Sequence, residues 1–162
     1  MNVNDIDVFI FDFDGVLTNN MVILDQNGKE SVACSRSDGL AFDVLRRLKK
    51  PVYILSTEKN AVVSERAKKL KISVMQGVED KIEGVKEIAK KENCSLKSVF
   101  YIGNDLNDYR VMSICGFTAC PADSHHKIKQ ISSIILKTNG GCGGIRELLE
   151  EVLKVDFIKI LY

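Results

Sequence analysis

Two aspartates separated by a single residue, Asp12 and Asp14, are the side chains in this sequence best suited to chemistry. They follow an apolar run at residues 8–11, which is typical of a strand buried on both faces, and they precede Gly15. If the strand ends at Asp12, its carboxylate lies at the strand tip, and the following turn carries Asp14 back over it. Ligands of parallel α/β sheets bind beyond such strand ends, and paired carboxylates there suit a hard cation such as Mg²⁺. The plainer alternative is that both aspartates only end a strand.

Three later apolar runs also lead into polar residues that could join this chemistry. A hydroxyl at a strand tip can hold a phosphate oxygen, although Ser56 could equally cap the helix that follows. A lysine at a strand-to-helix turn is usually exposed, but Lys81 lies where a cation could neutralise a transferring phosphoryl group. The strand-end residues are, in chain order, Ser56 and Thr57, then Lys81, and then Asn104, Asp105 and Asp108.

The alternation of apolar runs with helical periodicity predicts the elements that must position these residues. We expect strands over residues 8–11, 52–55, 72–75, 98–102, 116–120 and 134–136. We expect helices over 39–49, 59–70, 81–92, 108–115 and 124–131, and a last one that ends near 154, with Ser37 or Asp38 capping the first. This order predicts an α/β fold, a three-layer doubly wound parallel sheet with right-handed crossovers, in a single domain over residues 1–162.

Two further segments carry structural predictions of their own. Asn27-Gly28 lies between apolar segments and predicts a β-hairpin directly after the first strand, where it could cover or flank the site. The last eight residues, 155–162, are unusually apolar for a chain end, so we expect them to pack on the body or on a neighbouring subunit.

Composition narrows the possible partners and the compartment. The chain has 162 residues and a formal net charge of +1, which gives no support for nucleic acid or an anionic membrane surface as a partner. No apolar run approaches the roughly 20 residues that a membrane span needs, and no signal-peptide layout is present. The five cysteines form no C-x-x-C pair, so we expect free thiols in a reducing cytoplasm.

Residues 12–18 read Asp-Phe-Asp-Gly-Val-Leu-Thr, which resembles the first motif of the haloacid dehalogenase (HAD) superfamily. The polar residues at the later strand ends are similar, in order, to the remaining motifs of that superfamily. The resemblance implies a phosphatase in which Asp12 is the nucleophile, Asp14 is the general acid and base, and an aspartyl-phosphate forms on Asp12. It further implies that Lys81, Ser56 and Thr57 hold the phosphoryl group and that Mg²⁺ is bound by Asp12, Asp14, Asn104, Asp105 and Asp108.

One position departs from the superfamily pattern. Many members carry aspartate where this chain has Asn104, whose amide oxygen can still ligate Mg²⁺ but brings no charge. Asp105 or Asp108 could supply the missing carboxylate directly or through water. Asn104 therefore keeps open a second interpretation, a non-catalytic oligomerisation or regulatory module.

The spacing of the motifs leaves no room for a cap domain, and the chain resembles a capless branch of the superfamily. The shared segments are the hairpin, Ser37-Asp38-Gly39, Gln76-Gly77, residues 103–108 and the glycine-rich run 140–147. This branch contains phosphatases of eight- and nine-carbon 2-keto-3-deoxy sugar acids and the HAD-like domain of acylneuraminate cytidylyltransferases. It implies a homotetramer in which a neighbouring subunit covers the active site.

The same resemblance suggests the substrate. Glu58, Arg66 and Lys69 look like the nononate or sialic-acid side of the branch, where they are expected to reach the sugar phosphate across a subunit interface, and Thr18 is expected to contact it as well. The alternative for the three charged residues is ordinary solvated decoration of a helix surface. A broad-specificity phosphatase is a further possibility, and it would show a flat substrate profile.

Overall fold

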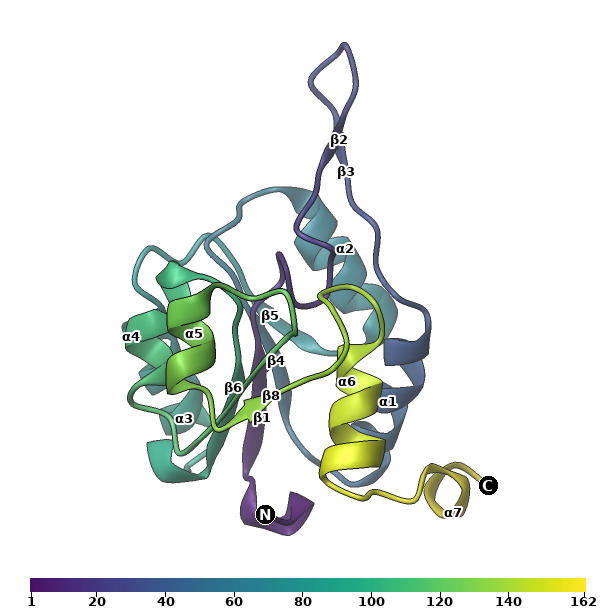
Figure 1. The fold of residues 1–162 in the computed structure, drawn as a ribbon, viewed down its shortest axis with the longest axis vertical. Coiled ribbons are helices and arrows are strands. Elements are labelled where there is room, and N and C mark those ends of the chain that lie inside the picture. The colour runs from purple at the N-terminus through teal and green to yellow at the C-terminus, as the bar shows by residue number, and fades with distance from the viewer.

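The computed structural model describes residues 1–162, and a six-stranded parallel sheet forms its centre (Figure 1). The strands lie in the order β5-β4-β1-β6-β7-β8, and every neighbouring pair is parallel. Their bounds are β1 (Val8–Phe11), β4 (Val52–Leu55), β5 (Ser73–Met75), β6 (Val99–Ile102), β7 (Phe117–Cys120) and β8 (Ile134–Ile135). The predicted doubly wound parallel fold is confirmed, with β1 in the middle of the sheet.

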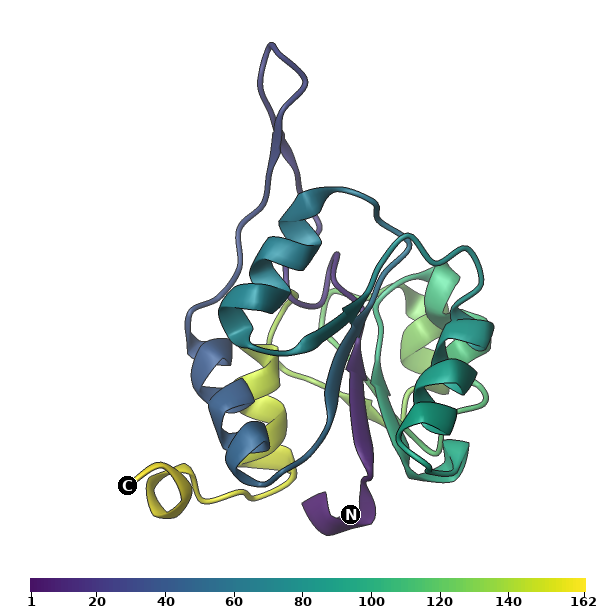
Figure 2. The same ribbon diagram turned by 180° about the vertical axis from the view of Figure 1, so that it is seen from behind.

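Helices cover both faces of the sheet and give the predicted three layers (Figures 1 and 2). One face carries α1 (Ser37–Arg47), α2 (Ala61–Leu70) and α6 (Gly144–Glu147), which continues as a π-helical turn over Leu148–Val152. The other face carries α3 (Lys81–Lys91), α4 (Tyr109–Met112) and α5 (His126–Ile131). Short 3-10 turns occur at Val3–Asp5, Leu96–Ser98 and Leu106–Asp108. None of the helices is long and apolar enough to cross a membrane.

Side chains of β1 alternate between the two cores. Phe9 and Phe11 point into the core under α1, α2 and α6, while Val8 and Ile10 point into the core under α3, α4 and α5. The Phe9 ring stacks on Phe100 of β6 with 5.5 Å between centroids. Because both faces of β1 are buried, its sequence is a continuous apolar run, and its polar groups begin only where the strand ends.

The predicted hairpin is present as β2 (Ile23–Leu24) paired antiparallel with β3 (Glu30–Ser31). Gly28 in its turn has φ +78°, a conformation that glycine adopts without strain. The hairpin projects far from the body at the end of the sheet where the parallel strands finish (Figures 1 and 2). The segment that leads into and forms β2 exposes a run of large apolar side chains at Met21, Val22, Ile23 and Leu24.

Helix starts differ from the prediction in two places. Arg36 precedes α1 without a side-chain cap, so neither Ser37 nor Asp38 caps that helix. Asp38 is buried and instead accepts hydrogen bonds from the backbone N–H groups of Ile145 and Arg146, at the start of α6. Asn60 caps α2, which leaves Ser56 free of the capping role.

Some predicted helices and strands are also shorter than expected. The helix predicted over 108–115 is a 3-10 turn followed by α4, which ends at Met112. The strand predicted over 116–120 begins at Phe117, because Gly116 closes against the backbone of Lys97.

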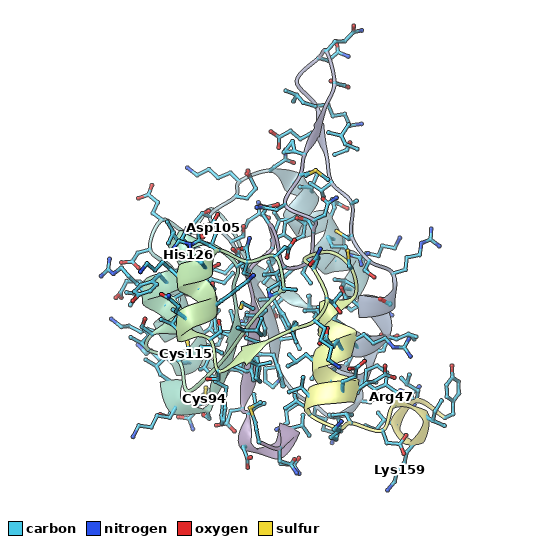
Figure 3. The ribbon with its side chains drawn as sticks, in the orientation of Figure 1. Arg47, Cys94, Asp105, Cys115, His126 and Lys159 are labelled. Atoms are coloured by element: carbon cyan, nitrogen blue, oxygen red, sulfur yellow. The ribbon has the colours of Figure 1, made fainter.

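The apolar tail packs on the body, as expected, through α7 (Phe157–Leu161). Phe157 is buried, and the Arg146 guanidinium lies 5.5 Å from the centre of its ring. Arg47 of α1 donates a hydrogen bond of 3.0 Å from Nη1 to the carbonyl oxygen of Ile160. Figure 3 places Arg47 and Lys159 together at this end of the molecule, opposite the end that carries Asp105.

Candidate active site

A polar cavity of about 420 Å³ opens at the carboxyl ends of β1, β4 and β6. These three strands are neighbours in the sheet, so segments far apart in the sequence meet there. Most of its lining residues come from the sequence-based prediction, together with Asn20, Leu106 and Asn107. The predicted residues that line it are Asp12, Asp14, Ser56, Thr57, Asn104 and Asp105.

Asp12 stands at the tip of β1, where its backbone N–H still donates 2.9 Å to the carbonyl of Ile102 on β6. Its side chain is almost fully buried and has a partner at each oxygen. Oδ1 accepts a 2.8 Å hydrogen bond from the N–H of Phe13, and Oδ2 lies 2.9 Å from Lys81 Nζ. The carboxylate is therefore fixed in orientation at the floor of the cavity.

Lys81 begins α3 and extends its side chain to the ends of β1 and β6. Its Nζ lies 2.7 Å from Asp108 Oδ1 as well as 2.9 Å from Asp12, and the side chain is 3% exposed. An ammonium has three N–H donors, so one remains for a substrate beside Asp12. The structure thus leaves one Lys81 donor unpaired beside the Asp12 carboxylate.

Asp108 has a different role from the metal ligand that the sequence predicted. It is fully buried, does not line the cavity, and accepts four hydrogen bonds. Its donors are Lys81 Nζ, the Tyr101 hydroxyl, and the backbone N–H groups of Asn104 and Asp105. Because its acceptor positions are occupied, Asp108 holds Lys81 rather than a metal ion.

The buried charges of this cluster do not cancel. Burial, and after it the charge of Asp108, raise the pKa of Asp12, and the Lys81 ammonium offsets only part of that rise. Burial alone would lower the pKa of Lys81, but Asp12 and Asp108 raise it above its ordinary value. Two carboxylates share one ammonium, and an additional cation would stabilise the ionised form of Asp12.

The donor set of the cavity fits Mg²⁺ better than a metal that needs several protein side chains. No group of three or more His, Cys, Asp or Glu side chains is arranged to hold a metal ion. The cavity instead offers the carboxylate of Asp12, the amide of Asn104 and the carboxylate of Asp105. Mg²⁺ is usually bound by one or two carboxylates and keeps waters or substrate phosphates as its other ligands.

Asp14 is half-buried above Asp12 and lines the same cavity. Burial and the nearby charge of Glu58 raise its pKa, while Lys81 and the Thr18 hydroxyl lower it by less. A raised pKa helps a carboxyl group to carry a proton near neutral pH, as a general acid must.

Thr18 lies behind the catalytic loop, not in the cavity. It is fully buried, and its Oγ1 accepts hydrogen bonds from Gly15 N at 3.1 Å and Asn20 N at 3.2 Å. Its hydroxyl therefore shapes the turn that carries Asp14. The sequence predicted that Thr18 contacts the substrate, but its buried side chain lies outside the cavity. Gly15 has φ +77°, and a side chain there would collide with Asn104.

Ser56 and Thr57 follow β4 and line the cavity from the other side of Asp12. Ser56 is buried, and its Oγ accepts a 3.1 Å hydrogen bond from Glu58 N, which leaves the hydroxyl proton available. Thr57 is exposed at the cavity wall. Their positions suit the binding of phosphoryl oxygens.

Glu58, Arg66 and Lys69 do not line the cavity of their own chain. The Glu58 carboxylate accepts hydrogen bonds from the N–H groups of Lys59 and Asn60, ahead of α2. Arg66 donates 2.7 Å from Nη2 to the carbonyl of Ser35. Arg66 and Lys69 line a second cavity of about 470 Å³ between α1 and α2.

Four residues of the site were not predicted: Asn20, Leu106 and Asn107, which line the cavity, and Tyr101. Asn20 has φ +60°, which reflects a turn that the sequence did not reveal. Tyr101 lies within an apolar strand, where its place in the sequence pattern is that of an ordinary core residue. Tyr101 differs from the other core residues of β6 only in the hydrogen bond that its hydroxyl donates to Asp108.

Asp12 and Lys81 thus form a buried ion pair at the end of the central strand of a parallel α/β sheet. A sequence model described as haloacid dehalogenase-like hydrolase matches residues 45–149, and the chain belongs to this family. This match confirms the family that the motifs resemble. It also agrees with the predicted fold and the predicted hydrolase activity.

Relatives with assigned activities point in the same direction. The chain is 29% identical over 147 residues to the 3-deoxy-D-manno-octulosonate 8-phosphate phosphatase of Yersinia pestis, covering 90% of this chain and 79% of that protein. The enzyme of the same name from Escherichia coli K12 is 28% identical over 90% of this chain and 78% of its own length.

Solved structures superpose closely. A putative HAD family hydrolase from Streptomyces avermitilis gives a TM-score of 0.90 at 35% identity, covering 93% of this chain and 86% of that chain. The octulosonate 8-phosphate phosphatase of Moraxella catarrhalis, solved with magnesium ion, phosphate ion and KDO, gives 0.88 at 31% identity, with coverage of 93% and 87%.

Proposed function

We propose that this protein is an Mg²⁺-dependent phosphatase that hydrolyses the phosphate monoester of an eight- or nine-carbon 2-keto-3-deoxy sugar acid. The observation that carries the proposal is a cavity lined by Asp12, Asp14 and Ser56, with Lys81 Nζ 2.9 Å from the Asp12 carboxylate. The octulosonate phosphatase names of its relatives support the sugar class.

The reaction follows from the contacts of these residues. An Asp12 oxygen attacks phosphorus, the bond from phosphorus to the sugar oxygen breaks, and an aspartyl-phosphate forms. Asp14 gives its proton to the departing sugar alcohol, then takes a proton from the water that attacks the aspartyl-phosphate and releases inorganic phosphate. Lys81 and the Ser56 hydroxyl hold the phosphoryl oxygens during both steps.

The metal that the family implies would add positive charge at this site. When bound, Mg²⁺ supplies positive charge that lets a carboxylate approach a phosphate dianion. Asp12, the backbone carbonyl of Asp14, Asn104 and Asp105 would hold it, and Asn104 would do so without a charge of its own.

Between the two sugar classes we favour the nine-carbon nononate or sialic-acid 9-phosphates. The support is the Thr57-Glu58 pair together with Arg66 and Lys69, which resemble the nononate side of the branch. Arg66 and Lys69 lie on a second cavity of their own chain, so a neighbouring subunit would have to bring them to the substrate.

Assembly as a homotetramer would meet that requirement. The projecting hairpin exposes the apolar run 21–24 near the end of the sheet where the cavity lies, and a neighbouring chain that buried this run could also cover the cavity. The five free cysteines support a reducing, cytoplasmic location.

The test is phosphate release by the purified protein with Mg²⁺. The substrates are 2-keto-3-deoxynononate 9-phosphate, N-acetylneuraminate 9-phosphate and 3-deoxy-D-manno-octulosonate 8-phosphate, with Asp12→Asn as the control. Turnover that is lost in the control establishes the phosphatase, and the preferred sugar decides the branch. A flat profile would indicate a broad-specificity enzyme, and no turnover on any ester would favour the non-catalytic module that Asn104 suggests.

A further inference from the structure

The Tyr101 hydroxyl is joined to the catalytic lysine through a single buried carboxylate. We propose that Tyr101 is a positioning residue that fixes Lys81 through Asp108. The inference rests on the proposed phosphatase function, since Lys81 is the group whose placement it explains. Tyr101 itself lines no part of the cavity.

Tyr101 is fully buried in β6, directly beside Ile10 of the central strand. Its ring lies among apolar side chains of the core under α3 and α4, and its hydroxyl donates 2.8 Å to Asp108 Oδ1. A buried hydroxyl without a partner is costly, so this hydrogen bond fixes the ring and the carboxylate together. Burial and the charge of Asp108 raise the pKa of the phenol well above its ordinary value, which keeps it a donor.

Asp108 Oδ1 accepts from Tyr101 at 2.8 Å and from Lys81 Nζ at 2.7 Å, so both donors meet at one oxygen. The backbone N–H of Asn104 holds the other oxygen at 2.9 Å. Without Tyr101, Oδ1 would keep Lys81 as its single donor in this network, and the carboxylate could turn. Any such turn would move Nζ away from its shared position between Asp12 and Asp108.

Tyr101 also changes how strongly Asp108 attracts Lys81. A hydrogen bond to a carboxylate oxygen stabilises its negative charge and reduces its pull on a second donor. Lys81 can then remain within 2.9 Å of Asp12 with one N–H left for the phosphoryl group. The arrangement serves the attack step and not the binding of the sugar.

The chain offers a matched control in Tyr53. This residue lies in β4, is nearly buried, and belongs to the same core on the same face of the sheet. Its hydroxyl donates to Glu92, which follows α3 at the end opposite Lys81. Tyr53→Phe therefore removes one hydroxyl bonded to a carboxylate without touching the Lys81 network.

The experiment compares Tyr101→Phe with Tyr53→Phe on p-nitrophenyl phosphate and on the preferred sugar phosphate, with Mg²⁺. We expect Tyr101→Phe to lower kcat about tenfold with KM changed by less than about twofold, because a lost charge-assisted hydrogen bond is worth about one factor of ten or more. We expect Tyr53→Phe to keep kcat within about twofold. An unchanged kcat in Tyr101→Phe, or an equal loss in both variants, would overturn the proposal.

A second measurement separates this inference from the proposed function. The chain has four tyrosines, so ¹³C labelling at Cζ gives few NMR signals, and the phenylalanine variants assign those of Tyr101 and Tyr53. In Lys81→Arg, which keeps the charge but alters its geometry, the Tyr101 signal should move and the Tyr53 signal should not. An unmoved Tyr101 signal would contradict the link to Lys81 even if the enzyme is active, and a moved one supports it even if no ester is hydrolysed.

Discussion

Lys81 lies between two buried carboxylates, and this arrangement decides how single residues of the site respond to change. The ion pairs to Asp12 and Asp108 are 2.9 Å and 2.7 Å long and almost completely shielded from water. Removing one partner of such a cluster usually leaves an uncompensated charge. Here two carboxylates share one ammonium, so the loss of one carboxylate should lower the unfolding free energy by less than in a simple buried pair.

Asp12→Asn removes the carboxylate that acts as the nucleophile in the proposed mechanism. Turnover should fall on the order of a thousandfold or more, because the amide is a poor nucleophile. Without Mg²⁺ the variant should unfold at the same or a higher temperature than the wild type, since burial and the Asp108 charge raise the pKa of Asp12 and disfavour its ionised form. Phosphate release and thermal unfolding measure the two effects.

Added Mg²⁺ should reverse this order of stability. The wild type should gain stability with increasing Mg²⁺ by mass action, and Asp12→Asn should gain much less because it lacks the central carboxylate ligand. Equal Mg²⁺ stabilisation of both proteins would show that the metal binds elsewhere.

At the scale of elements, Asp38 joins two helices that are distant in sequence. It belongs to α1 but accepts hydrogen bonds of 3.1 Å and 3.2 Å from the N–H groups of Ile145 and Arg146. Burial raises its pKa to about 6, despite these hydrogen bonds and the charge of Arg66. The contact therefore depends on pH.

The native state binds the Asp38 proton more tightly than the unfolded chain, whose carboxyl titrates near 3.8. Stability from this group is complete below the unfolded pKa and is lost as the pH rises through about 6. Relative to Asp38→Asn, the wild type should lose roughly 2–3 kcal/mol of unfolding free energy between about pH 4 and pH 6.5. Urea unfolding of both proteins across this range measures it, and a constant offset would contradict the assignment.

Gly15, in the loop between Asp12 and Thr18, and Gly28, in the hairpin turn, share one backbone conformation in different surroundings. Their φ angles are +77° and +78°, but a side chain at Gly15 meets Asn104 and one at Gly28 meets open space. Gly28→Ala should cost about 1 kcal/mol, the usual strain of this conformation. Gly15→Ala should cost more and should weaken Mg²⁺ affinity by displacing Asn104, as calorimetric titration can measure.

The sheet, the hairpin and the position of the cavity could be predicted from the sequence, because they depend on apolar periodicity and on where strands end. Asp12 and Asn104 could be placed at one edge from the order of the motifs alone. The roles of Asp108, Thr18 and Asp38 could not, because each depends on hydrogen bonds to backbone groups that come together only in the folded chain. Tyr101 was hidden for a related reason, since its ring follows the core pattern and only its hydroxyl is polar.

At the scale of the whole molecule, we expect the exposed apolar hairpin to be the surface through which subunits associate. Ile23 is 70% exposed at the hairpin and Ile158 is 72% exposed on α7, so the two isoleucines form a matched pair. If the proposed homotetramer forms through the hairpin, Ile23→Glu should dissociate it and lower kcat/KM for the sugar phosphate about tenfold or more, since charge in an apolar interface is costly. Ile158→Glu should change neither.

Analytical ultracentrifugation combined with kinetics on both variants measures these effects. A smaller loss on p-nitrophenyl phosphate is expected, because that substrate lacks the sugar that Arg66 and Lys69 of a neighbour are proposed to contact. Dissociation by Ile158→Glu instead of Ile23→Glu would place the interface at α7.

The base of the hairpin adjoins the loop that carries Asp14, since Thr18, four residues after Asp14, forms an isolated antiparallel bridge with Cys34. An association that shifts this base would change substrate affinity at Asp14. Linkage then requires the reverse: substrate must strengthen subunit association by the same factor. The sugar phosphate would in that case act as a ligand of assembly, and dilution would lower its apparent affinity before the fold itself is lost.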